Sequence, residues 1–124
     1  MAEQLSITII RRGGFAAFDD RIVIEPDGAL QVRSRARPQG ERGRLVPDWH
    51  HRLTAACAAV DWPALGTAQP QVRYPDDMIV AVSTPEGIAR TEDDRLGELG
   101  PLADGLINDL MGGIADSTAA TTEG

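Results

Sequence analysis

Apolar residues alternate with polar ones in three parts of the chain, which is the pattern of half-buried β-strands. These parts are residues 5–9, 22–32 and 78–91. The second and third are interrupted by Pro-Asp-Gly at 26–28 and Pro-Glu-Gly at 85–87. Proline presets φ, the acid accepts a local hydrogen bond and glycine tolerates a positive φ, so each triplet predicts the turn of a β-hairpin.

Two helices are predicted from apolar residues that recur every three or four positions. The first follows Pro47, which suits the first turn of a helix, and ends at Trp62-Pro63. Its apolar face consists of Trp49, Leu53, Ala56, Cys57 and Val60. The second opens near Pro101, and residues 112–113 (Gly-Gly) stop it. Its stripe consists of Leu99, Leu102, Leu106 and Leu110.

The remaining segments lack this periodicity. Residues 33–46 contain five arginines, two glycines and one proline, which predicts a mobile, exposed connector. Residues 64–77 are rich in glycine, proline and polar residues and predict a long loop. Residues 114–124 are small, polar and acidic, and such a composition buries too little surface to offset the entropy of ordering, so we expect a disordered acidic tail.

The predicted fold is therefore a single α+β domain over residues 1–113. We expect a two-layer sandwich, in which an antiparallel sheet of four to five strands carries two helices on one face, with the elements in the order hairpin, helix, hairpin, helix.

Charge divides the chain into two unlike halves. All twelve basic residues are arginine; residues 1–60 hold 9 of them against 7 acids, residues 61–124 hold 3 against 12 acids, and the net charge is −7. The acidic half would repel phosphates, so nucleic-acid binding is disfavoured. No apolar run approaches the roughly 20 residues of a membrane helix, and the acidic start is unlike a signal peptide, so we expect no membrane association and a cytoplasmic protein.

Groups suited to catalysis or metal binding are sparse. The histidines are the adjacent pair His50-His51, which point about 100° apart on a helix and cannot share one ligand or proton. Cys57 is the single cysteine, and the acids at 76–77 and 92–94 are consecutive where a calcium loop alternates its ligands. We expect no catalytic residue, no metal and no cofactor. An enzyme would need a site assembled from scattered acids and arginines, which only the fold can reveal.

One segment, residues 12–18, differs from plain scaffolding. Its two glycines allow close backbone approach, and Phe15 and Phe18 follow at once, two of only five aromatic residues in the chain. The segment is either a binding loop or a wide turn whose phenylalanines cap the core.

The chain resembles the emfourin-like proteins, which are small protein inhibitors of thermolysin-like zinc metallopeptidases. The resemblance rests on a strand ending in Arg-x-Gly-Gly-Phe-Ala at residues 11–16, a helix, a Pro-Asp segment leading into a hairpin at 75–91, and a leucine-rich terminal helix at 99–110. It covers residues 5–111. The resemblance implies a tight complex in which the domain plugs the active-site cleft of the peptidase by loop insertion, without chemistry of its own.

These enzymes prefer a bulky apolar side chain just after the scissile bond, a place that Phe15 would take, while Asp76, Asp77 or a backbone carbonyl would approach the zinc. The expected partner-binding residues are Arg12, Gly13, Gly14, Phe15, Ala16, Asp76 and Asp77. The alternative function is a non-catalytic interaction module, an adaptor or small subunit that pairs through its acidic C-terminal half or its arginine-rich connector. The particular peptidase and the oligomeric state stay open.

Overall fold

The fold is built on one antiparallel β-sheet. The computed structural model describes residues 6–15 and 17–122. Seven strands of these residues pair in the order β6-β5-β1-β2-β3-β4-β7, every pair antiparallel. Their bounds are β1 Ile7–Gly13, β2 Phe18–Ile24, β3 Ala29–Arg33, β4 Glu41–Leu45, β5 Met78–Thr84, β6 Gly87–Arg90 and β7 Ala120–Thr122.

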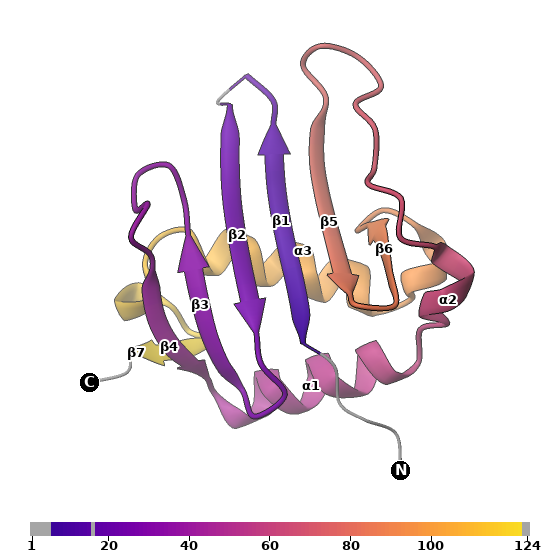
Figure 1. Ribbon diagram of the computed structural model, residues 1–124. Coiled ribbons are helices and arrows are strands. Elements are labelled where there is room, and N and C mark those ends of the chain that lie inside the picture. Colours follow the sequence, from indigo (N-terminus) through magenta and orange to yellow (C-terminus); the bar gives the residue numbers. More distant parts are fainter. Residues whose placement is uncertain (1–5, 16, 123–124) are drawn as a thin grey trace.

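The two long helices are α1 Pro47–Ala58 and α3 Leu99–Leu110; α2 Trp62–Leu65 is a single turn, and η1 Asp94–Leu96 and η2 Ile114–Asp116 are 3₁₀ turns. In Figure 1, α3 crosses behind the sheet and α1 runs along its lower end, and side chains of both helices pack in one core with the same face of the sheet. No helix of the described chain covers the opposite face over β1 to β4, which we call the open face. Pro47 opens α1, as predicted. Within the described residues, none of these helices has the length and apolar character that a membrane span needs.

The core lies between the sheet and the helices. Successive strand residues point to opposite faces, so Ile9, Ile22 and Val82 are fully buried beneath the helices. They pack with apolar residues of α1 and α3, including Leu53 and Leu106. A second, small cluster lies on the other face of the sheet, made of Ile79, Ala81 and Ile88 with Ile10 packed against it.

The predicted sheet of four to five strands with two helices in hairpin–helix–hairpin–helix order is wrong, because the described residues form seven strands and three helices. One extra strand, β4, lies in the arginine-rich segment 33–46 expected to be a mobile connector. Its inward positions are Gly43 and Leu45. A Cβ at Gly43 would lie 3.1 Å from the side chain of Ile114, so Ile114 fills the space that a side chain of β4 would otherwise occupy. The sequence of β4 therefore lacks the apolar alternation that marks a strand.

The other extra strand, β7, lies in the segment 114–124 that we expected to be a disordered tail. It pairs with β4, and Ala119 and Ala120 are buried. The carboxylate of Asp109 in α3 holds the segment, because it accepts hydrogen bonds from the Ser117 hydroxyl and from the Ala119 amide at 3.1 Å. These anchors come from residues distant from β7 itself, so local composition does not reveal them.

The third helix arises where we predicted that the first would end. Trp62 begins α2 and is buried, and its indole Nε1–H donates to the carbonyl of Cys57 at 3.1 Å. The turn of chain at Trp62-Pro63 therefore packs against the core and does not simply lead into a loop.

Candidate functional site

The turn between β1 and β2 projects from one end of the sheet. Gly13 and Gly14 both have positive φ, 87° and 76°, which a residue with a Cβ rarely adopts. The Ala17 amide donates to the Gly14 carbonyl at 3.1 Å and closes the turn. Phe15 stands at its tip with 93% of its surface exposed. Phe18 is half-buried beneath the Arg11 guanidinium, 4.0 Å from the ring centroid. Of the two phenylalanines, Phe15 therefore does not cap the core.

The long loop before β5 ends beside this turn, and one buried carboxylate holds its shape. Asp77 is 2% exposed and accepts hydrogen bonds from the Arg90 side chain at 2.7 Å and from the Arg73 amide at 3.0 Å. The Asp77 amide donates to the Tyr74 carbonyl at 2.9 Å, which closes a β-turn with Pro75 at its second position. Arg90 also donates to the Gln71 carbonyl at 2.7 Å, so β6 fastens the loop at two points.

The same contacts set the ionisation of Asp77. The Arg90 side chain, followed by the Arg73 amide, holds the pKa of this carboxyl well below its usual range. Asp77 is thus a charged anchor inside the loop.

The turn and the loop touch each other through their backbones. Gly13 pairs with Met78, and a Cβ at Gly13 would lie only 2.6 Å from the Asp77 carbonyl oxygen. Gly14 lies against the Met78 side chain, which a Cβ would meet at 3.4 Å. The two glycines therefore permit both the turn itself and the close approach of the loop.

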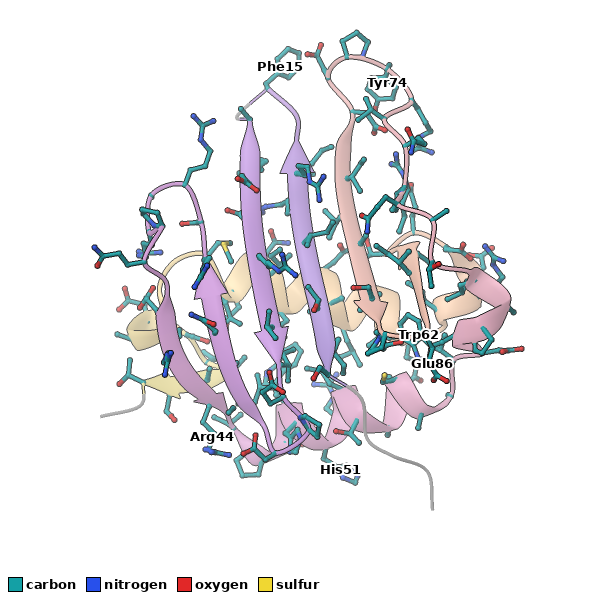
Figure 2. All side chains as sticks on the ribbon, in the orientation of Figure 1. Phe15, Arg44, His51, Trp62, Tyr74 and Glu86 are labelled. Carbon is teal, nitrogen blue, oxygen red and sulfur yellow. The ribbon has the colours of Figure 1, made fainter. Side chains whose placement is uncertain are left out.

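Together these segments form what we call the apolar edge, residues 13–15 and 72–78. Every large hydrophobic residue that is exposed within the described chain lies in it: Phe15 at 93%, Val72 at 59%, Tyr74 at 57% and Met78 at 44%. Figure 2 shows Phe15 and Tyr74 at the same end of the sheet, away from the helices. A concentration of exposed apolar side chains at one place is typical of a surface that binds another molecule.

The fold brings most of the predicted partner-binding residues to this edge. Gly13, Gly14 and Phe15 form the turn, Asp76 is exposed in the adjoining loop, and Arg12 is exposed on the open face of the sheet at the end of β1. Ala16 lies outside the described residues. Asp77, in contrast, points inward to Arg90, so of the two consecutive acids only Asp76 faces solvent.

Sequence reasoning missed the apolar residues of the second segment. The glycines, prolines and polar residues of 64–77 predict only a loop, although Val72 and Tyr74 lie within it. Two large apolar residues between Pro70 and Pro75, in a loop otherwise polar, are the signal that could have found them.

Groups that could perform chemistry are dispersed. Within the described residues no three His, Cys, Asp or Glu side chains lie close enough to hold a metal ion. The Nε2 of His50 lies 2.9 Å from the Pro26 carbonyl oxygen, while His51 is exposed. Burial raises the pKa of the Cys57 thiol, which disfavours the reactive thiolate.

Comparison of the chain with protein families, curated proteins and solved structures found no match.

Proposed function

We propose that this chain is a proteinaceous inhibitor of a thermolysin-like zinc metallopeptidase and that it blocks the active-site cleft by inserting the apolar edge. The class of target rests on the resemblance carried by residues 11–16, 75–91 and 99–110. The observation that supports insertion into the cleft is the exposure of Phe15 at the tip of a hairpin turn.

Phe15 supplies the contact energy. A phenylalanine that passes from water into an apolar pocket contributes about 1.5–3 kcal/mol. A 93% exposed ring has nearly all of that contribution still available, and the pocket that receives the residue after the scissile bond is apolar in this class of enzyme. Tyr74 and Val72 add apolar surface beside it.

The hydrogen bonds beneath the edge supply rigidity. Binding costs less when the contacting segment is already ordered. The Gly14–Ala17 bond orders the turn, and the Asp77 contacts with Arg73 and Arg90 order the loop. An ordered loop also resists the extended conformation that a peptidase needs in order to cleave it.

The role of a zinc-approaching acid falls to Asp76. Asp77 is committed to Arg90 and cannot leave without breaking the loop. Asp76 is the exposed neighbour, and its carboxylate oxygens are suitable ligands for Zn²⁺.

The experiment is a titration of a thermolysin-like peptidase with the pure chain, read as residual activity against dose. Phe15→Ala should raise the inhibition constant about 10- to 150-fold, which corresponds to losing about 1.5–3 kcal/mol of binding free energy. Phe15→Leu should keep most of the inhibition because leucine is also bulky and apolar. Arg52→Ala on α1, exposed and far from the edge, is the matched control and should change nothing.

Two results would refute the proposal. The first is no inhibition at a large excess of the chain over several thermolysin-like enzymes. The second is inhibition that Phe15→Ala leaves intact. Binding of the peptidase without loss of activity would instead favour the alternative function, a non-catalytic interaction module.

A further inference from the structure

Arginines gather on the open face of the sheet. Strand register places Arg12 on the same face as Ile10, because the two are separated by two positions in β1. Ile10 is opposite Arg21, and Arg21 is opposite Arg33. Gln31, two positions before Arg33, is opposite a further arginine of β4. We call this group the arginine band: Arg12, Arg21, Arg33, Arg42 and Arg44, all exposed.

The band crosses four adjacent strands, β1 to β4, on the side that faces the viewer in Figure 1. Taken in chain order, consecutive arginines of the band are direct neighbours across two strands, diagonal neighbours across two strands, or two positions apart on one strand. Such neighbours are spaced by about 5–8 Å in a sheet. Among the five arginines of the band, only Arg44 forms an ion pair within the described residues, with Asp27 at 3.8 Å. Asp19 lies opposite Arg12 but does not pair with it.

The arginine band lowers the stability of the sheet. Like charges directly opposite one another destabilise a sheet, and Arg21 and Arg33 are such a pair. A local conflict of this kind is expected where a surface has a role other than stability.

The band also contrasts with the rest of a chain whose net charge is −7. Five exposed acids belong to the helices, their caps and the 3₁₀ turns: Asp48, Asp61, Asp94, Glu98 and Asp116. Beside the five arginines of the band, the exposed acids are Asp19 opposite Arg12 and, after the end of β2, Glu25 and Asp27. The open face therefore presents a positive field on an otherwise negative molecule, which attracts and orients an acidic partner.

Carboxylates fit the band better than nucleic acid does. Arginine binds a carboxylate with two parallel hydrogen bonds, and alternate residues of an extended peptide are about 6.6–6.8 Å apart, close to the spacing of the band. Single-stranded nucleic acid is held by bases that stack on aromatic rings. None of the residues that neighbour the band on this face is aromatic: they are Thr8, Ile10, Asp19, Val23, Ala29, Gln31 and Ile79.

We propose that the arginine band binds an acidic segment of a protein partner, one that places carboxylates at roughly 7 Å intervals. This surface is distinct from the apolar edge, and the proposal holds whether or not the chain inhibits a peptidase.

The test measures the anisotropy of a labelled peptide of alternating glutamate and serine, about twelve residues long, at low salt. A peptide with glutamine in place of glutamate is the ligand control. The double variant Arg21→Gln/Arg33→Gln should weaken binding about tenfold and leave the melting temperature unchanged or higher, because the opposed like charges are gone. The double variant Arg52→Gln/Arg95→Gln removes two exposed arginines outside the band and should bind the peptide like the wild type.

Three results would overturn the proposal. Equal loss of binding in both double variants would mean that the peptide senses net charge only. Equal binding of the glutamine peptide would exclude carboxylate recognition. Tighter binding of single-stranded oligothymidylate, or of phosphatidylserine vesicles, than of the acidic peptide would assign the band to phosphate groups.

Discussion

Replacing Gly13 by alanine tests the contact that joins the two segments of the apolar edge. At φ 87° a residue with a Cβ carries strain of about 1–3 kcal/mol. The added Cβ would also lie 2.6 Å from the Asp77 carbonyl oxygen, whereas real Cβ contacts essentially never fall under 3.0 Å. Relieving that clash requires β1 and β5 to move apart, at a further cost of about 1–3 kcal/mol. Gly13→Ala should therefore lower the free energy of unfolding by roughly 2–6 kcal/mol.

Gly66→Ala is the matched control for this experiment. Gly66 also has a positive φ, 75°, but nothing lies within 4 Å of the place of its Cβ, so only the strain of about 1–3 kcal/mol applies. Urea unfolding followed by tryptophan fluorescence measures both variants, since Trp62 is buried and becomes exposed on unfolding. Equal destabilisation by the two substitutions would refute the close contact between Gly13 and the loop.

Three further predictions concern the loop anchor, the thiol and the last strand. Asp77→Asn should lower the melting temperature at pH 7. The folded pKa of Asp77 is depressed, so the stabilisation from its carboxylate is present above its unfolded pKa of about 4 and is lost as the pH falls. The difference in melting temperature between wild type and variant should therefore narrow from about pH 5 to pH 2. A difference that stays constant over this range would contradict the prediction. Cys57, buried and with a raised pKa, should react with a thiol reagent at least about tenfold more slowly in the folded protein than in urea, and equal rates would show that the thiol is accessible. Truncation after Ser117 should lower the free energy of unfolding, measured in urea, by at least about 2 kcal/mol, because it removes buried Ala119 and Ala120 and the hydrogen bonds between β7 and β4. An unchanged urea midpoint would mean that β7 contributes nothing to stability.

The sequence reveals the elements whose own residues carry their pattern. Apolar alternation marks β2 and β3 around the 26–28 turn, and helical spacing marks α1 and α3. Strands β4 and β7 are not visible because only Leu45 is a large apolar residue at their inward positions, the others being Gly43 and Ala120. Packing by Ile114 against Gly43 and the hydrogen bond from the Ala119 amide to Asp109 hold these strands in place. Those contributions come from other parts of the chain, which local periodicity does not contain.

Some features of the candidate site are likewise visible in the sequence, and others appear only in the fold. The two glycines followed by Phe15 are visible because glycine pairs and aromatic residues are locally distinctive. The separation of Asp76 from Asp77 is not visible, since it depends on the register that turns Asp77 toward Arg90 in a neighbouring strand. The arginine band escapes for a similar reason, because its members are scattered over residues 12–44 and only strand pairing gathers them on one face.

The short strand β7 has a consequence for how the molecule opens. It is an edge strand of the sheet and pairs with β4 over only three residues, so few hydrogen bonds have to break for it to open. We therefore expect β7 to detach before the rest of the sheet does, in an opening that hydrogen exchange would detect in the β4 amides. A detached β7 leaves β4 as an unpaired edge, and the β7 of a second molecule can occupy it, so concentrated solutions of this protein should slowly form strand-exchanged dimers.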